Sequence, residues 1–293
     1  MRLLILGHGY SAGFVTRHVT ALGWQVTGTT RGDAARVADA GAVPLIWPGD
    51  DAAVRAAIAG ADAILSSVGP APDGADPVLA AFGDVIAAAR PRWLGYFSTT
   101  GLYGDRGGDW VDEDTPPAPT TRRGQARLLA EGAWQDMADR ASLRLNIFRL
   151  AGIYGPGRGP FQKLRNGTAR RIIKANQVFS RIHAEDIAQI VAATLPGGPA
   201  ARAAAGGGIW NLCDDDPAPP EDVIACAAGL LGVPIPPAQP FEQARMDPMA
   251  RSFYSESKRV SNARIKKDLE ITLKYPDYLT GLTAILAAES RSG

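Results

Sequence analysis

An apolar run that breaks into glycine lies at the start of the chain and constrains its fold more than any other stretch. Residues 3–6 read Leu-Leu-Ile-Leu, a composition typical of a strand buried on both faces of a parallel sheet. Residues 12–23 then place apolar side chains at helical spacing. Between the two segments, Gly7, Gly9 and Ala12 fit the pattern G-x-G-x-x-G/A. The sequence therefore predicts a strand, a tight turn and a helix in immediate succession.

Each small residue of this pattern has its own physical role. Gly7 permits the tight turn, Gly9 leaves the main chain open to a phosphate, and Ala12 lets the helix pack close to the strand. The N–H groups at the start of the helix, including those of Tyr10 and Ser11, are free to bind an anion. An ordinary strand-to-helix turn is the alternative, but the position between a buried strand and a helix favours a dinucleotide-binding turn.

Strands and helices alternate through the first half of the chain. This alternation predicts right-handed βαβ units and a Rossmann-type α/β fold with a doubly wound parallel sheet. Ligands of such sheets bind at the carboxyl ends of the strands, so the loops after residues 6, 30, 68 and 98 are expected to line the site. The expected strands are 3–6, 25–30, 43–47, 63–68, 93–98 and 143–148, and the expected helices are 12–23, 51–59, 76–89 and 124–140.

The pattern loosens beyond residue 150. Residues 195–208 are rich in glycine, proline and alanine and are interpreted as an exposed flexible loop. We expect residues 1–150 to form a dinucleotide-binding domain. Residues 151–293 are expected to form a smaller mixed cap and substrate region that completes the fold and does not fold independently. Helices are expected there at residues 184–195, 219–231, 261–269 and 278–288.

Charge and cysteine content narrow the class of protein. The formal net charge is +1, so no strong field favours nucleic acid as a partner. Cys213 and Cys226 lack metal-ligand spacing and the three histidines lie far apart, which predicts reduced thiols and no metal site. No apolar stretch reaches about 18 residues, and the first strand leaves no room for a signal peptide. We therefore expect a soluble, cytoplasmic protein without membrane contact.

The end of the second expected strand bears on which dinucleotide would bind. NAD-selective sites usually place a carboxylate there, about 20 residues after the glycine motif, to bind the ribose 2′-OH. Here Thr30 and Arg31 occupy this place, and the first carboxylate is Asp33. Arginine suits a 2′-phosphate, so NADP(H) is favoured over NAD(H), although a solvated surface arginine is the alternative. Small residues after the fourth strand are expected to let the cofactor pass closely: Ser66, Ser67 and Gly69.

Four segments, in order along the chain, resemble motifs of one known family. Residues 96–117 contain STTGLYG, similar to S-S-x-x-V-Y-G, and residues 148–158 contain RLAGIYGPGR, similar to R-x-x-G-x-Y-G-P-x-x. Residues 180–189 and 209–224 are similar to the segments I-H-x-x-D and N-x-x-D-x-x-P of the same family. These motifs resemble the extended short-chain dehydrogenase/reductases of the NAD-dependent epimerase/dehydratase superfamily. The resemblance implies a Rossmann fold with a nicotinamide dinucleotide site.

The resemblance also implies where catalysis occurs, and there the chain departs from the family. The family's Ser/Thr that polarises a substrate oxygen falls on Thr99. Its Tyr-x-x-x-Lys pair falls on Arg123 and Arg127, with Glu131 matching the family's later glutamate. Because arginine stays protonated in water-accessible sites, Arg123 cannot act as a general base. The chain is thus similar to atypical members of the superfamily.

Several residues are candidates for the missing roles. Arg127 is expected to bond the nicotinamide ribose and Arg123 to hold a substrate carboxylate or phosphate, whereas an ordinary charged helix face is the alternative. Tyr103 is the nearest replacement acid, although the family's tyrosine there is mostly a packing residue. Arg158 is a candidate anion contact. The acidic residues 112–114 are interpreted as a solvated loop.

Two functions of different kinds follow from these residues. The first is an NADP-dependent reductase, epimerase or dehydratase on a polar or nucleotide-linked substrate, in which Thr99 orients the substrate oxygen and Tyr103 or ordered water carries the proton. The second is a non-catalytic protein that binds NADP(H) and senses redox state, which the missing tyrosine favours. A structural subunit of a larger assembly is a third reading. A small-molecule partner is expected, and the sequence leaves a homodimer open.

Overall fold

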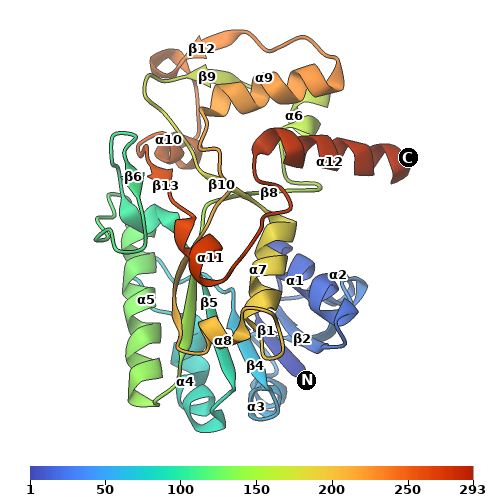
Figure 1. Ribbon diagram of the computed structural model, residues 1–293, viewed down its shortest axis with the longest axis vertical. Coiled ribbons are helices and arrows are strands. Elements are labelled where there is room, and N and C mark those ends of the chain that lie inside the picture. The colour runs from blue at the N-terminus through green and yellow to red at the C-terminus, as the bar shows by residue number, and fades with distance from the viewer. Residues whose placement is uncertain (293) are drawn as a thin grey trace.

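A seven-stranded parallel sheet forms the centre of the molecule (Figure 1). The computed structural model describes residues 1–292. The strand order is β11-β7-β5-β4-β1-β2-β3, and it reverses between β1 and β4, the position at which ligands bind sheets of this kind. The predicted Rossmann-type α/β fold is confirmed. The strands are β1 (Arg2–Leu6), β2 (Gln25–Thr30), β3 (Val43–Ile46), β4 (Ala63–Ser66), β5 (Trp93–Thr99), β7 (Leu145–Leu150) and β11 (Gly208–Leu212).

Alternate side chains of the strands supply two separate cores, one on each face of the sheet. Leu3 and Ile5 of β1 lie in the core that α1, α2 and α7 cover, whereas Leu4 and Leu6 lie in the core that α3, α4 and α5 cover. A strand buried in this way must be apolar at every position, which explains the run at residues 3–6. The covering helices are α1 (Tyr10–Ala21), α2 (Ala34–Asp39), α7 (Ala184–Thr194), α3 (Asp51–Ala59), α4 (Pro77–Ala89) and α5 (Arg122–Arg140).

A cap built from residues after 150 lies over the carboxyl edge of the sheet (Figure 1). Its own core includes Tyr154, Phe161 and Leu282. The division into two domains at residue 150 stays a prediction. The central sheet does not end at that residue, because β11 joins the sheet and α7 covers it. The cap contains β8 (Gly152–Tyr154), α6 (Phe161–Arg165), β9 (Arg171–Ile173), β10 (Arg181–His183), α9 (Pro220–Leu231), β12 (Ala238–Pro240), α10 (Pro248–Phe253) and α12 (Tyr278–Ser292).

Short elements connect the sheet and the cap. β6 pairs in parallel with β13, which brings the loop after β5 beside the segment that precedes α11. The register joins Trp110 to Arg259 and Val111 to Val260. No helix among residues 1–292 is long and apolar enough to span a membrane. The elements are β6 (Trp110–Val111), the 3₁₀ helices η1 (Thr100–Tyr103) and η2 (Phe241–Gln243), β13 (Arg259–Val260) and α11 (Ala263–Asp268).

The prediction of an exposed flexible loop at residues 195–208 is wrong in part, although most of the segment outside its short helix is turn. This segment contains the short helix α8 (Ala201–Ala204), and Ala200 and Ala204 are 4% and 1% exposed. An alanine- and glycine-rich stretch has no amphipathic pattern, so the sequence did not indicate the helix. Gly208, the last residue of the stretch, already belongs to β11.

Element boundaries differ from the expected ones by about two residues. α1 begins at Tyr10 rather than at residue 12, because Gly9 is its N-cap. β7 runs over Leu145–Leu150 rather than 143–148, and Ser142, just before it, has a positive φ of 52°. The short helices α2, α6, α8 and α10 and the three-residue strands of the cap were not expected, since they are too short to show periodicity.

Candidate functional site

The glycine turn after β1 is shaped by its contacts with β4 and β2. Gly7 has a φ of +88°, and a Cβ there would lie 2.7 Å from Val68 Cγ2. Its N–H donates to Thr29 Oγ1 at 2.7 Å. Only glycine meets both requirements without strain, so the chain needs Gly7 to fold as it does.

Gly9 is unrestricted by the protein itself. A Cβ added at Gly9 would have no atom within 4 Å, and the φ of −93° is accessible to other residues. The first bond along α1 runs from Gly13 N to Gly9 O at 3.1 Å, so the preceding N–H groups, those of Tyr10, Ser11 and Ala12, lie ahead of it at the helix N-terminus. Open space beside free N–H groups is the arrangement that a diphosphate requires.

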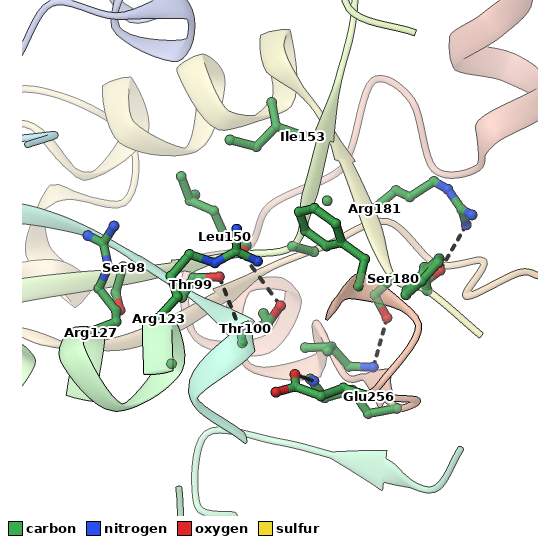
Figure 2. A pocket seen from close by; sticks show the side chains of 18 of the residues that line it. Ser98, Thr99, Thr100, Arg123, Arg127, Leu150, Ile153, Ser180, Arg181 and Glu256 are labelled. Carbon is green, nitrogen blue, oxygen red and sulfur yellow. Dashed lines mark hydrogen bonds and ion pairs between the residues drawn. The ribbon is translucent and has the colours of Figure 1, made fainter. Parts of the chain in front are cut away.

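One cavity of about 680 Å³ extends from this turn along the ends of β5 and β7 into the cap. Tyr10, Ser11 and Ser67 line it at the glycine turn, and Thr99 lines it at the end of β5. Figure 2 shows the labelled residues around this cavity. Its charged lining is mostly cationic: Arg123, Arg127, Arg158, Arg181, Lys258 and Glu256.

The start of α5 brings the two predicted arginines into this cavity. Arg127 donates from Nη1 to Phe97 O at 2.7 Å and to Tyr96 Oη at 3.0 Å, which fixes its guanidinium against β5. Arg123 is exposed, and its guanidinium carbon lies 4.7 Å from the ring centre of Phe253 in α10. Arg127 is therefore held in place, whereas Arg123 is presented between the sheet and the cap.

Thr99 and Ser98 end β5 at the cavity wall (Figure 2). Thr99 Oγ1 accepts the N–H of Gly101 at 3.1 Å, and this bond begins the 3₁₀ helix η1. Its own hydroxyl proton is thereby left to donate elsewhere. Ser98 Oγ is buried without a hydrogen-bond partner among residues 1–292.

The structure speaks against Tyr103 as the proton donor. Tyr103 is 0% exposed and does not line the cavity. Its hydroxyl donates to Asn211 Oδ1 at 2.8 Å and accepts from Arg149 Nη1 at 2.9 Å, and burial raises its pKa. Arg149 also forms a bidentate pair with Glu131, at 2.8 and 3.2 Å. These groups connect α5, β7 and β11 behind the site and do not face a substrate.

The acidic loop at residues 112–114 is not uniformly solvated, which corrects the expectation from sequence. Glu113 is 7% exposed and accepts the N–H of Asn211 at 2.8 Å. Burial raises the pKa of Glu113, and the Arg264 guanidinium lies 3.6 Å away. Asp112 and Asp114 do remain at the surface.

Of the residues predicted for the ribose and for the cofactor backbone, Ser67 lines the cavity, whereas Thr30, Arg31, Ser66 and Gly69 do not. Thr30 ends β2, and Arg31, which follows it, is exposed. Ser66 ends β4 with its hydroxyl buried and unpartnered among residues 1–292. A Cβ at Gly69 would lie 3.6 Å from Arg127 Nη2, which is an ordinary contact, so Arg127 lies beside the loop after β4.

Tyr10 connects the glycine turn to the cap. Its hydroxyl donates to Pro156 O at 2.9 Å, and the Arg158 guanidinium carbon lies 5.5 Å from its ring centre. Burial raises the pKa of Tyr10 to about 12, so this hydroxyl keeps its proton at neutral pH. The side chain therefore has a docking role as well as the backbone role that was predicted.

The structure adds functional candidates that sequence reasoning missed. Glu256 and Lys258 form an ion pair at 2.7 Å in the cavity wall, and Lys258 also donates to Gly104 O at 2.7 Å. Arg181 lines the same wall and donates to two backbone carbonyls. Arg36 of α2 reaches the glycine turn and donates to His8 O at 2.6 Å. Apart from Arg181, which lies within a motif segment, no local pattern distinguishes these residues.

Metal chemistry has no obvious centre in the part of the chain that the structure describes, where no three His, Cys, Asp or Glu side chains gather in a metal-binding group. His183 caps α7, because its Nδ1 accepts the N–H of Glu185 at 3.2 Å. Burial lowers the pKa of His183 to about 4. Cys213 is fully buried and Cys226 is partly exposed, and both are free thiols.

Comparison with known proteins gives both close and distant likenesses. No protein-family model matches the sequence. YeeZ of Escherichia coli is 28% identical over 297 residues, covering 95% of this chain and 97% of its own. The structure of a functionally unknown conserved protein from Silicibacter pomeroyi is 50% identical over 98% of both chains, with a TM-score of 0.88. A protein from Methylobacillus flagellatus, provisionally described as an NAD-dependent epimerase/dehydratase, is 27% identical over 99% of this chain and 98% of its own (TM-score 0.73).

More distant structures share the fold. The human epimerase family protein SDR39U1, solved with NADPH, is 19% identical over 98% of this chain and 99% of its own, with a TM-score of 0.74. UDP-glucose-4-epimerase from Stenotrophomonas maltophila, solved with NAD and formylated UDP-arabinopyranose, is 17% identical over 100% of both chains, with the same TM-score. With the glycine turn and the matching segments, these likenesses agree on one fold. Over nearly its whole length the chain is similar to NAD-dependent epimerase/dehydratases and shares the Rossmann-type fold of the short-chain dehydrogenase/reductase structures.

Proposed function

We propose that this protein is an NADP(H)-dependent enzyme of the epimerase/dehydratase type that acts on an anionic, nucleotide-linked substrate. The observation that carries the proposal is the cavity of about 680 Å³, which joins the glycine turn to Thr99 and to several cationic side chains. A protein that only bound a dinucleotide would not need this cavity to continue past the end of β5 into the cap.

The glycine turn fits a dinucleotide on the evidence of its own atoms. The open space at Gly9 and the N–H groups at the start of α1 would hold the pyrophosphate. Ser67, which lines the cavity just after β4, would face the cofactor backbone. Structural relatives bind either NADPH or NAD, which supports a nicotinamide dinucleotide here. We favour NADP(H), because Thr30 ends β2 and the exposed Arg31 follows it, with no carboxylate before Asp33.

The charge of the cavity supports an anionic substrate. Five of its six charged lining side chains are cations, and the one carboxylate, Glu256, is already paired with Lys258. A second cavity, of about 690 Å³, lies in the cap and shares Arg181 and Phe253 with the first. Four cations, one carboxylate (Asp247) and several apolar side chains line it, and this excess of positive charge suits a phosphate joined to an aromatic base. We propose that a nucleotide-linked substrate spans both cavities.

The side chains at the end of β5 indicate how the reaction would be assisted. When bound, the nicotinamide supplies or accepts a hydride. Thr99 donates its free hydroxyl proton to the substrate oxygen and so orients it. Arg123 and Arg127 carry permanent charge and stabilise negative charge that develops on that oxygen. Because Tyr103 is buried away from the cavity, the exchanged proton comes from water in it.

A non-catalytic NADP(H) sensor is the second candidate function. One observation favours it: Arg123 and Arg127 stand at the positions where the family has its proton relay, and neither can exchange a proton at neutral pH. In that case Tyr10, which joins the glycine turn to the cap through Pro156, would transmit occupancy. The retained Thr99 and the continuation of the cavity into the cap favour the enzyme.

Calorimetry and turnover assays together separate these candidates. We expect the protein to bind NADPH and NADP⁺. It should either oxidise NADPH with an aldehyde or ketone from a panel or, with NADP⁺ bound, convert a nucleotide sugar without net change of the cofactor, which chromatography of the sugar detects. Thr99→Ala should lower turnover by about 100-fold, as for the loss of one donor to a developing oxyanion. The control is Thr283→Ala, an exposed threonine of α12 that should leave turnover unchanged.

Three outcomes count against parts of the proposal. Turnover that is equal in Thr99→Ala and the wild type removes Thr99 from the mechanism. NADPH binding without turnover across the panel favours the sensor. Absence of binding to both NADPH and NADH overturns the proposed function altogether.

A further inference from the structure

The glycine turn and the end of β2 form one hydrogen-bonded unit. Gly7 N donates to Thr29 Oγ1 and His8 N donates to Thr29 O, both at 2.7 Å. Arg36 closes the unit from α2, because its Nη2 donates to His8 O at 2.6 Å. The turn expected to hold a pyrophosphate and the loop expected to hold the adenosine ribose are thus connected through one arginine.

Arg36 also pairs with Asp33, the first carboxylate after β2 in the sequence. Asp33 is the N-cap of α2, and its Oδ1 accepts the N–H of Arg36 at 3.0 Å. Its Oδ2 lies 3.3 Å from Arg36 Nε. Both oxygens of Asp33 therefore have a partner on the same residue. The Asp33 carboxylate is thus turned toward α2 and is not free to accept from a ribose hydroxyl.

We propose that Arg36 is a second selectivity residue for the 2′-phosphate of NADP(H), and that it acts with Arg31 by supplying charge and by neutralising Asp33. This inference rests on the proposed function, since it needs a dinucleotide at the glycine turn. It goes further by naming a residue of α2 that the motif does not include. It also implies that the negative charge of Asp33 disfavours the 2′-phosphate and that Asp33 does not bind the ribose.

The reasoning depends on how the two cofactors differ. NADPH carries a phosphate where NADH has a hydroxyl, so a nearby cation favours NADPH and an unpaired carboxylate disfavours it. The side chain of Arg36 is 45% exposed, which leaves its remaining N–H groups open to a ligand. If Arg36 only stabilised the turn, both cofactors would lose affinity equally when it is replaced. The ratio of the two affinities therefore distinguishes selectivity from support.

Calorimetry of NADPH and NADH binding to four proteins tests the proposal. Arg36→Gln keeps a hydrogen-bond donor and removes the charge, and should weaken NADPH binding by about 10- to 100-fold but NADH binding by less than about threefold. Asp33→Asn keeps an N-cap of equal quality and should tighten NADPH binding by up to about threefold. The control is Arg55→Gln, because Arg55 of α3 also donates to a backbone carbonyl, that of Ala81, away from the turn.

The salt dependence gives a second readout. The NADPH preference of the wild type should fall as ionic strength rises, and that of Arg36→Gln should change much less. Equal losses for NADPH and NADH in Arg36→Gln would overturn the inference and leave Arg36 a support of the turn. If the wild type binds neither cofactor, the proposed function itself fails, and the two failures are thereby distinguished.

Discussion

The two glycines of the motif, Gly7 and Gly9, should respond differently to replacement by alanine. In Gly9→Ala the new Cβ meets no protein atom within 4 Å and the backbone φ of −93° is accessible, so the free energy of unfolding should change by at most about 1 kcal/mol. In Gly7→Ala the φ of +88° costs about 1 to 2 kcal/mol, and the 2.7 Å approach to Val68 adds about 1 to 3 kcal/mol. The total destabilisation is about 2 to 5 kcal/mol, which lowers the melting temperature by about 3 to 8 °C in a chain of this size.

In Gly9→Ala, NADPH affinity should fall although the free energy of unfolding hardly changes. A methyl group placed in the space reserved for the pyrophosphate should weaken NADPH binding by about 1 to 3 kcal/mol, roughly 5- to 150-fold. Thermal unfolding measures the first effect, and calorimetry of the folded variant measures the second. Wild-type affinity in Gly9→Ala would refute the assignment of this space to a diphosphate. A loss of stability equal to that of Gly7→Ala would show that Gly9 serves the fold.

Two further predictions concern buried charges. Glu131→Gln should lower the free energy of unfolding by about 3 to 5 kcal/mol in denaturant titrations, because it leaves the buried Arg149 without its carboxylate. Burial raises the pKa of Asp214 to about 8, so the folded protein keeps a proton that the unfolded chain releases, and stability should fall as pH rises toward 8. Burial lowers the pKa of His8 and His183 to about 4, which opposes this trend only below about pH 6.5. Between pH 6.5 and 8 the unfolding free energy should fall by roughly 2 kcal/mol, and Asp214→Asn should remove the slope.

Each of these predictions has a matched control. Glu289 forms an exposed ion pair with Arg165 at 2.6 Å, so Glu289→Gln should change stability by less than about 1 kcal/mol. A similar loss in Glu289→Gln and Glu131→Gln would contradict the role given to burial. For Asp214, an unchanged slope in the asparagine variant would assign the pH dependence to other groups.

Sequence reasoning located the parts of the site that depend on local chain geometry. The apolar run and the glycines predicted β1, the turn and α1, because a buried strand and a sharp turn each restrict residue type at consecutive positions. The motif segments placed Thr99, Arg123 and Arg127 near one another, and all three line one cavity. Such features are carried by neighbours in sequence, so they need no knowledge of the fold.

The tertiary structure decided which distant residues meet. Arg36 lies 28 residues from the carbonyl it contacts, and Lys258 lies 154 residues from Gly104, whose carbonyl it holds at the cavity wall. Tyr103 follows Thr99 closely in sequence, yet its side chain is buried against Asn211 of β11. No local pattern records such contacts, because sheet order and the packing of the cap determine them. The sequence by itself therefore determined the fold and the turn that would receive a dinucleotide, whereas only the folded chain determined which charges surround it.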